Sequence, residues 1–538
     1  MTTVREAALQ LFRSHRLTTW FGNPGSSELT LLEDFPDDFT YVLGLQEMVP
    51  VGMADGYAQI TRRPALVNLH TAPGIGNAMG ALLNAAWNKT PLVVTAGNQR
   101  RAMQNQQALL TNVDATLVPR PFVKWAAEPS TASEVPAVLA HAIHLAQTPP
   151  TGPVFVSLPM DDMTTELDDQ QLSDIDRIRD RRVTHAGGLS RSDASEIARR
   201  LDASSAPALI VGAEVERSGS WEAVVALAER CRATVWTAPL SGLSGFPETH
   251  PLYHGLLPPG VGWISRALEG HDLVLVLGAP AFRYYAQIPG PYLPEGTQLI
   301  HITGDPDEAA RAPVGDAVVA DVRAVAESLL EHLSQTDRPA PPARPEPGAI
   351  ESSTVPLSPS SLFGTLGQIA PADTLWVTEA PSHQLAIGEH IRAGAPFSHM
   401  SAAGGGLGFG LPAALGAQLA APGRPVVALI GDGSMHYAIT ALWTAAVYEI
   451  PLTIVVASNG EYGVLKQFGK LEQTNGVPGL DLPSLDIVAT AKSYGVAAHE
   501  ARDTDELGEL FSAGLADRAR PTLINVQTVK VGDVALAY

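Results

Sequence analysis

Short apolar runs alternate with helix-like patterns along the whole chain, and this alternation limits the possible fold more than any other feature of the sequence. Most runs are apolar at every position and end in Gly, Pro, Ser or Asn, as strands buried on both faces of a parallel sheet do. Stretches such as 77–88 and 438–447 carry Ala, Leu and Met at helical spacing. The strand-like runs are 65–70, 92–96, 154–158, 208–211, 273–277, 299–302, 375–377, 426–430, 452–457 and 523–526. The pattern predicts an α/β protein made of doubly wound parallel sheets.

Two polar stretches interrupt this alternation. Residues 161–182 are acidic, and residues 337–360 are rich in Pro, Ser and Glu. A stretch so poor in apolar residues and so rich in proline does not pack as a core. We therefore expect three α/β domains at 1–180, 181–338 and 360–538, with a proline-rich linker at 339–359.

Charge and cysteine content narrow the class of protein. The net charge of -21 argues against a nucleic-acid partner, because a phosphate backbone would repel it. No apolar run approaches the roughly 18 residues that a membrane-spanning helix needs, and the N-terminus lacks the apolar core of a signal peptide. The lone cysteine, Cys231, cannot form an internal disulfide. A cytoplasmic enzyme without membrane or nucleic-acid partners is expected.

Polar residues follow two consecutive strands in the C-terminal third. Asp432 comes directly after the run 426–430, and Asn459 follows the run 452–457. In a βαβ unit both residues lie at the carboxyl edge of neighbouring strands, where open α/β sheets bind ligands. A carboxylate, an amide oxygen and a backbone carbonyl suit Mg²⁺, which prefers oxygen ligands.

Glycines surround the aspartate and suit a diphosphate group. Gly431 and Gly433 let the backbone approach phosphates, and the helix N-terminus that follows favours negative charge. The candidate diphosphate-binding residues are Gly431, Asp432, Gly433 and Ser434. A plain Gly-Asp-Gly turn before a helix is the alternative for the tripeptide alone.

Gly431-Asp432-Gly433, followed at this distance by Ser458-Asn459, resembles the fingerprint of thiamine-diphosphate-dependent enzymes. The family usually has two asparagines at the second position, and Asn459 keeps the one that binds metal. The resemblance implies Mg²⁺, or Ca²⁺ or Mn²⁺ in its place, held by Asp432, Asn459 and the backbone carbonyl of Glu461. It also implies that the C-terminal domain binds the diphosphate.

Glu47 stands before a helix-like stretch that contains Ala54-Asp55-Gly56-Tyr57-Ala58. A Glu in a first helical turn is usually a capping charge. The stretch also resembles the glutamate motif of the same family, in which that carboxylate bonds to the aminopyrimidine ring and promotes removal of the C2 proton. The resemblance implies a pyrimidine-binding N-terminal domain. It also implies sites shared between two subunits, so we expect a homodimer at least, and a homotetramer as the assembly.

Within the family the likeness is greatest to benzoylformate decarboxylases, and it implies further roles. Ser26 would bond the substrate carboxylate, and His70 would move protons at the former carbonyl group. The Gly405 carbonyl would accept from the 4′-amino group, and Leu407 would support the bent cofactor. Without the family, Ser26 is an ordinary turn or N-cap residue, His70 is a structural histidine before a glycine-rich loop at 71–76, and the glycines at 404–406 are a flexible turn.

The substrate pocket is expected to be apolar. Its candidate walls are Leu109, Leu110, Val464, Leu465 and Phe468. The last three have helical spacing, so ordinary core packing is an open alternative for them. Tyr285 stands where benzoylformate decarboxylases have a second histidine, and with an ordinary pKa of about 10 it is a poorer proton shuttle near neutral pH. Pro381 and Ser401 also replace pocket residues of that group.

These features predict a carbon–carbon lyase that decarboxylates a 2-oxo acid without oxidation, benzoylformate first, as in mandelate breakdown. An aldehyde carboligase or lyase, or a decarboxylase of other bulky 2-oxo acids on the same cofactor, is the alternative. A cofactor-binding scaffold with little catalysis is a third hypothesis, against which Glu47, Asp432 and Asn459 argue. The central domain resembles a nucleotide-binding fold but has no glycine fingerprint for FAD.

Overall fold

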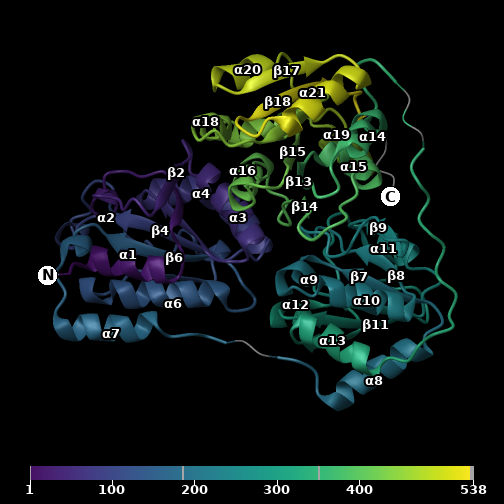
Figure 1. The fold of residues 1–538 in the computed structure, drawn as a ribbon, viewed down its shortest axis with the longest axis horizontal. Coiled ribbons are helices and arrows are strands. Elements are labelled where there is room, and N and C mark those ends of the chain that lie inside the picture. The colour runs from purple at the N-terminus through teal and green to yellow at the C-terminus, as the bar shows by residue number, and fades with distance from the viewer. Residues whose placement is uncertain (1, 185–186, 349, 351, 533–538) are drawn as a thin grey trace.

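The computed structural model describes residues 2–184, 187–348, 350 and 352–532. It contains three six-stranded sheets, and all their strands pair in parallel (Figure 1). Side chains along each sheet alternate between two hydrophobic clusters, so helices cover both faces. The predicted fold class, three doubly wound parallel-sheet domains, is confirmed.

The sequence did not predict one inner strand of the N-terminal sheet, Thr19–Gly22. Trp20 and Leu66 point into one core, while Phe21 and Val67 point into the other. The strands, in their order across the sheet, are β2 (Thr40–Leu43), β1 (Thr19–Gly22), β3 (Ala65–Leu69), β4 (Leu92–Asn98), β6 (Val154–Pro159) and β5 (Trp125–Ala127). The longer helices are α1 (Val4–Ser14), α3 (Met48–Thr61), α4 (Thr71–Trp87) and α6 (Val135–Gln147), and the short ones are α2 (Leu29–Leu32), α5 (Arg101–Gln104), η1 (Arg120–Phe122), η2 (Ala132–Glu134) and η3 (Asp162–Thr164).

Two local predictions for this domain were wrong. The stretch 161–182 is not simply a linker, because it forms helix α7 (Asp169–Arg179). The Asp168 side chain caps that helix, and Ile175 is buried against α1 and α6. Residues 71–76 are not a loop but the first turns of α4, where Pro73 is tolerated because its missing N–H has no helical partner there.

The central sheet has the strand order of dinucleotide-binding domains. Its strands are β12 (Asp316–Val319), β11 (Gln298–Thr303), β10 (Leu273–Leu277), β7 (Pro207–Val211), β8 (Thr234–Thr237) and β9 (Tyr253–Leu256). Its helices are α8 (Arg191–Ala203), α9 (Ala213–Ser218), α10 (Trp221–Cys231), α11 (Val261–Ala267), α12 (Pro306–Arg311) and α13 (Val322–His332).

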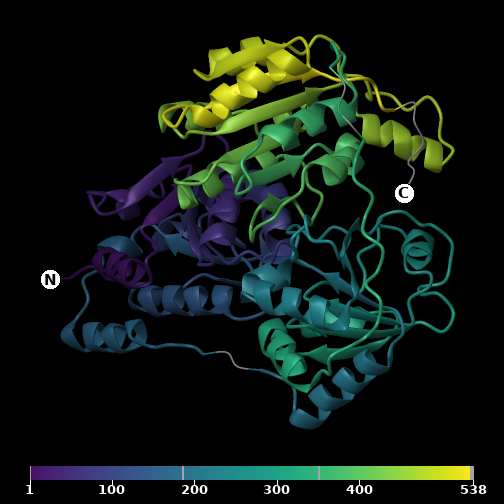
Figure 2. The same ribbon diagram turned by 45° about the vertical axis from the view of Figure 1, so that its right-hand side comes forward.

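The C-terminal sheet repeats the strand order of the N-terminal one. Its strands are β14 (His399–Met400), β13 (Leu375–Glu379), β15 (Val426–Gly431), β16 (Thr453–Ser458), β18 (Thr522–Gln527) and β17 (Ala497–Ala501). Its helices are α14 (Pro359–Ile369), η4 (Pro381–His383), α15 (Gln384–His390), α16 (Gly410–Ala420), α17 (Asp432–Met435), η5 (His436–Ala438), α18 (Ala441–Val447), α19 (Gly463–Leu471), α20 (Ile487–Ser493) and α21 (Thr504–Ala516). Between α13 and α14 the described residues form no helix or strand, and this segment runs along the outside of the central domain (Figures 1 and 2).

Helices α3 and α16 join the two outer domains through one continuous hydrophobic core. Their backbones come unusually close, because a Cβ on Gly416 would lie 1.8 Å from the Met53 carbonyl oxygen and one on Gly56 would lie 2.0 Å from that of Ala413. Only glycine permits this approach. The position of the N-terminal domain relative to the C-terminal domain is therefore set by direct backbone packing.

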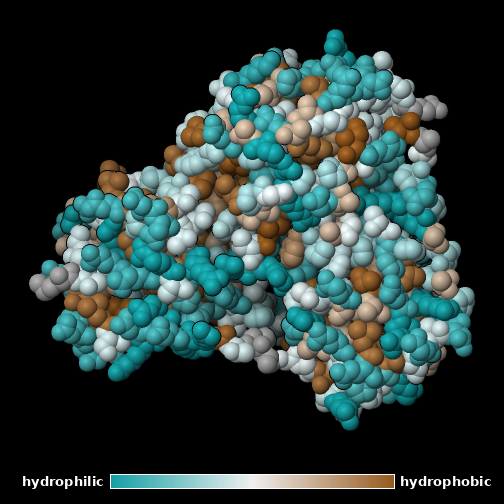
Figure 3. Space-filling view, in the orientation of Figure 1, coloured by the Kyte–Doolittle hydropathy of each residue, from teal (hydrophilic) through white to brown (hydrophobic). Residues whose placement is uncertain are grey.

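The surface drawn in Figure 3 is largely hydrophilic, with hydrophobic residues in scattered groups and a hollow between the N-terminal and central domains. Within the described residues no helix is long and apolar enough to cross a membrane.

Candidate active site

The two outer domains collect the predicted residues at equivalent points of their sheets. In each sheet the chain leaves one strand for a neighbour on one side and then crosses to the other side, and ligands bind at the carboxyl ends of the strands where this reversal occurs. In the N-terminal sheet the reversal lies between β1 and β3, which lead into Ser26 and His70 respectively. In the C-terminal sheet it lies between β13 and β15, which end at Glu379 and lead into Asp432.

Asp432 and the Asn459 turn are in direct contact. Gly431 and Ala457 are paired across β15 and β16, so the residues that follow them meet at the sheet edge. One Asp432 carboxylate oxygen accepts from the Gly460 N–H at 2.8 Å, and the other accepts from the Gly433 N–H at 2.8 Å. The Asn459 side-chain oxygen accepts from the Glu461 N–H at 3.0 Å. The structure therefore brings the three residues predicted for the metal together at one edge of the sheet.

The chemistry of this turn fits a hard divalent cation. Asp432 is 5% exposed, and burial raises the pKa of its carboxyl. Among the described residues it forms no ion pair with a cationic side chain, and its charge is stabilised by the backbone N–H groups of Gly433, Asn459 and Gly460. No cluster of three His, Cys, Asp or Glu side chains suited to a metal occurs in the described part of the chain. A carboxylate with an amide and a carbonyl oxygen is instead the donor set that Mg²⁺ accepts.

The predicted diphosphate-binding residues lie beside this turn. A Cβ on Gly431 would have its nearest neighbour at 3.7 Å, the Ser434 hydroxyl, and Asp432 opens the short helix α17. Gly433 has a different reason to be glycine, because a Cβ there would lie 2.6 Å from the Tyr462 ring. Gly431 is thus partly exposed and has no close neighbour on this side, whereas the Ser434 beside it is 5% exposed.

Glu379, which the sequence did not single out, organises the loop between β14 and α16. It is buried at the end of β13 and accepts from the backbone N–H groups of Gly408 (2.7 Å) and Gly410. Burial raises the pKa of its carboxyl to about 7. Glu379 therefore holds the loop that carries Gly405 and Leu407 in place. The alternative interpretation of residues 404–406 as a flexible turn does not agree with these hydrogen bonds. An acidic residue ending an apolar strand was the available signal for Glu379.

Glu47 lies at the N-cap position of α3, but its side chain makes no capping hydrogen bond. Its Oε2 accepts from the Asn77 side-chain amide of α4 at 2.9 Å. No donor of the described residues bonds its Oε1, and Glu47 is only partly buried within the single chain. Glu47 therefore does not cap α3 through a hydrogen bond, and one carboxylate oxygen is available to a ligand.

His70 belongs to a hydrogen-bonded group that sequence reasoning missed in part. Its Nδ1 lies 2.9 Å from a carboxylate oxygen of Glu28 and 3.1 Å from the Ser27 hydroxyl. Glu28 is 1% exposed and also accepts from the Gly25 and Gly97 N–H groups. Ser26, the predicted residue, is exposed instead. An Nδ1–H bonded to a buried carboxylate leaves Nε2 as the reactive nitrogen.

The backbone beside His70 is strained. Thr71 follows it with a φ of 36°, in the left-handed region that β-branched residues avoid. Such a conformation costs on the order of 1–3 kcal/mol and is typical of functional sites. Leu110, a candidate pocket wall, also has a positive φ, of 68°.

The remaining candidate pocket residues are not core residues. Val464, Leu465 and Phe468 lie on α19 directly after the Asn459 turn, and none of them is buried. Phe468 makes an edge-to-face contact with Tyr285 of the central domain, with 4.7 Å between ring centroids. The core-packing alternative for α19 is therefore wrong. Leu109 is 84% exposed on a loop of the N-terminal domain.

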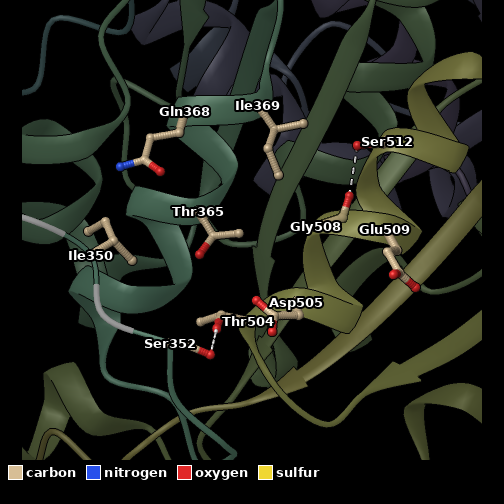
Figure 4. A pocket seen from close by; sticks show the side chains of 10 residues that line it. All are labelled: Ile350, Ser352, Thr365, Gln368, Ile369, Thr504, Asp505, Gly508, Glu509 and Ser512. Carbon is tan, nitrogen blue, oxygen red and sulfur yellow. Dashed lines mark hydrogen bonds between the residues drawn. The ribbon is translucent and has the colours of Figure 1, made fainter.

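A surface hollow of about 600 Å³ lies elsewhere, between α14 and α21. Figure 4 shows Thr365, Gln368 and Glu509 around it, and Ser512 and Thr504 use their hydroxyls in local hydrogen bonds. It contains none of the candidate residues.

Three family models match the chain. Residues 2–117 match the N-terminal TPP binding domain of thiamine pyrophosphate enzymes, residues 194–329 match their central domain, and residues 380–526 match their C-terminal TPP binding domain.

Full-length relatives are also similar. Benzoylformate decarboxylase of Pseudomonas aeruginosa is 46% identical over 98% of this chain and 99% of its own, and an acetolactate synthase of Arthrospira platensis is 25% identical over 98% and 94%. Among solved structures, a thiamine diphosphate-dependent 4-hydroxybenzoylformate decarboxylase of Rhodococcus jostii RHA1 superposes with a TM-score of 0.95 at 45% identity, covering 98% of this chain and 99% of that one. Benzoylformate decarboxylase of Polynucleobacter necessarius gives 0.94 at 41% identity, with the same coverage.

Proposed function

The chain belongs to the thiamine pyrophosphate enzymes, and from this premise we propose that it decarboxylates an aromatic 2-oxo acid, benzoylformate first, to the aldehyde and CO₂. The observation that carries the proposal is that the two outer sheets carry complementary groups at the carboxyl ends of their strands. One sheet has Glu47 and the His70–Glu28 pair, and the other has the Asp432–Asn459 turn. Similarity to benzoylformate and 4-hydroxybenzoylformate decarboxylases supports the aromatic substrate.

In the proposed site Asp432, Asn459 and the Glu461 carbonyl hold Mg²⁺, or Ca²⁺ or Mn²⁺, and Gly431 and Ser434 face the diphosphate. When bound, thiamine diphosphate supplies a carbon nucleophile and an electron sink for the pair left by departing CO₂. The C-terminal domain is thus the diphosphate-binding domain, and the N-terminal domain is the pyrimidine-binding one.

Glu47 is the acid that activates the pyrimidine. Asn77 bonds its Oε2 and fixes the carboxylate, while Oε1 remains available to the ring nitrogen. A carboxylate with a single protein donor retains its basicity better than one that accepts several hydrogen bonds.

His70 and Ser26 act on the substrate. Glu28 accepts from His70 Nδ1 and fixes the imidazole, so that Nε2 moves the proton at the former carbonyl group. The Ser26 hydroxyl is exposed beside it and bonds the carboxylate that leaves. Phe468, Leu465 and Tyr285 form an apolar wall against which an aromatic ring packs.

A second copy of the chain completes the site. Glu47 and Asn77 are accessible in the single chain, and large apolar side chains of the N-terminal domain and of α19 are exposed as well. The exposed apolar residues concerned are Leu45, Leu109, Leu110, Val113, Leu117, Tyr285 and Leu465. Large apolar side chains that are exposed in a single chain often mark a surface that another subunit covers. We infer a homodimer that assembles into a homotetramer, located in the cytoplasm.

The test is product analysis with the purified protein, thiamine diphosphate and Mg²⁺. We expect CO₂ and aldehyde in equal amounts from benzoylformate and 4-hydroxybenzoylformate, and a lower kcat/KM for pyruvate. The control is His70→Ala, which should bind the cofactor normally and release little CO₂. Absence of CO₂ from every 2-oxo acid tried, with cofactor bound, would refute the decarboxylase.

Tyr285 favours a second candidate function, aldehyde ligation. It stands where benzoylformate decarboxylases have a histidine, and it is 65% exposed. A weaker proton donor prolongs the life of the nucleophilic state that remains after CO₂ loss. Mixing benzaldehyde with acetaldehyde and measuring 2-hydroxyketone formation tests this activity directly.

A further inference from the structure

We propose that Asn84 and Asn88 of α4 are positioning residues that fix the Gly404–Gly406 loop for the cofactor. This inference rests on the proposed function, in which the Gly405 carbonyl accepts from the 4′-amino group. Neither asparagine touches that carbonyl, and both act through the backbone on either side of it.

Asn84 holds both backbone groups of Gly406. Its side-chain amide donates to the Gly406 carbonyl at 2.8 Å, and its side-chain oxygen accepts from the Gly406 N–H at 3.0 Å. Asn88, one turn later, accepts from the Ala403 N–H at 2.9 Å. The two side chains therefore grip the loop immediately before and immediately after Gly404-Gly405.

The loop depends on this external support. Three successive glycines have no side chains with which to pack, and each is costly to order. Gly405 has a φ of 68°, and a Cβ on it would meet nothing within 4 Å, so this residue faces open space. Asn84 and Asn88, by contrast, are 1% and 2% exposed. The order of Gly405 is thus supplied by buried groups of another domain.

The same asparagines belong to a rigid framework with Glu47. The Asn88 amide donates to Asp55 at 3.1 Å, and Asp55 lies on α3, the helix that follows Glu47. Asn77, which bonds Glu47, lies two turns before Asn84 on the same face of α4. One helix therefore fixes both the acid and the loop.

The chemical consequence concerns the aminopyrimidine. Its 4′-amino group needs an acceptor at hydrogen-bond distance, and misplacement of a positioning group by about 1 Å can cost roughly 100-fold in rate. Loss of the two Asn84 bonds removes the support of Gly406, so the three glycines can shift between the points that Asn88 and Glu379 still hold. We expect this shift to lower the affinity for the cofactor and the kcat, and to leave the KM for the 2-oxo acid little changed.

The experiment compares Asn84→Ala with wild-type protein by three measurements. These are the Kd of thiamine diphosphate at saturating Mg²⁺ from tryptophan quenching, the near-ultraviolet circular dichroism of the bound iminopyrimidine, and kcat against KM. Two lost hydrogen bonds predict a Kd raised roughly 10- to 30-fold. The dichroism band should weaken at full cofactor saturation.

Lys89→Ala is the matched control. Lys89 lies next to Asn88 and also crosses to another domain, since its ammonium pairs with Asp305 and Glu308 of the central domain at 2.9 and 2.8 Å. This variant should lower the melting temperature without changing the Kd or the band. If Asn84→Ala does not fold, Asn84→Ser, which keeps one hydroxyl at the position, provides the same comparison.

An unchanged Kd and band in Asn84→Ala, or equal effects in Lys89→Ala, would overturn the proposal. Failure of the proposed function is distinguishable, because it would appear as wild-type protein that binds the cofactor and releases no CO₂. The Kd comparison would still be readable in that case.

Discussion

Replacement of Gly416 by alanine should destabilise the protein, because the added methyl group would push α3 and α16 apart. The new Cβ would lie 1.8 Å from the Met53 carbonyl oxygen and 2.9 Å from the Tyr57 nitrogen, and real Cβ atoms do not approach closer than 3.0 Å. The helices must therefore separate by about 1.2 Å. Because α3 is buried along most of its length, this movement opens gaps on all its sides.

The loss in unfolding free energy depends on the atom that the new methyl group meets, which here is a backbone carbonyl oxygen. Overpacking of a core costs about 1–3 kcal/mol, and a clash with the backbone of a buried helix belongs at the upper end, about 3 kcal/mol. Alanine regains about 1 kcal/mol over glycine in a helix interior. The net loss in unfolding free energy is about 2 kcal/mol. Gly388→Ala on α15 is the matched control, since a Cβ there meets nothing within 4 Å.

Urea unfolding followed by tryptophan fluorescence measures both variants. Gly388→Ala should be stabilised by about 0.5–1 kcal/mol, so the two alanine variants should differ by about 3 kcal/mol. Gly416→Ala should also bind thiamine diphosphate more weakly, because the Gly405 loop leads directly into α16. If Gly416→Ala unfolds at the same urea concentration as Gly388→Ala, the close crossing of these helices is refuted.

Three further predictions concern the site and its surroundings. Glu47→Gln should lower the decarboxylation rate by at least about 100-fold while cofactor binding persists, as stopped-flow kinetics and fluorescence titration would measure; normal turnover would contradict the assigned role. A chelator should release the cofactor, and Mg²⁺ should restore its binding in wild-type protein but not in Asp432→Ala, as measured by gel filtration and cofactor absorbance. Burial raises the pKa of Asp55 from 3.8 to about 6, so its contribution to stability is full below about pH 4 and declines by about 3 kcal/mol as pH rises through 6. The stability difference between wild type and Asp55→Asn should therefore fall from pH 4 to 6.5 in urea titrations, and a difference that rises with pH would contradict the buried, protonated carboxyl.

Most inner strands of the three sheets could be predicted from sequence, and most edge strands could not. All ten predicted runs are strands of the structure, because central parallel strands are apolar on both faces. The edge strands β5, β9, β12, β14 and β17 were missed, since they are partly exposed and lack a continuous apolar signal. The inner strands β1 and β8 were missed as well, because each has only four residues and includes polar positions. The strand order is a property of long-range pairing, and no local pattern encodes it.

The candidate site divides in the same way. Asp432 and Asn459 could be predicted because each stands at the end of a central strand in a recognisable motif. Glu28 could not, because it reads as a surface residue of a short polar turn and only the fold brings it to His70, 42 positions away. Asn84 was hidden for the same reason, since its partner Gly406 is 322 positions distant. Residues that act on other protein groups leave no local pattern.

Asn88 stands where all three domains meet, and this limits how such a chain can be recombined. Its side chain bonds Asp55 and the Ala403 N–H, while its carbonyl accepts from Arg217 of the central domain at 2.8 Å. A chimera whose central domain came from a relative without an arginine at this position would leave the Asn88 carbonyl oxygen without a hydrogen-bond donor. Exchange of modules between such enzymes thus has to respect this junction, and crossover points that split it should yield insoluble hybrids.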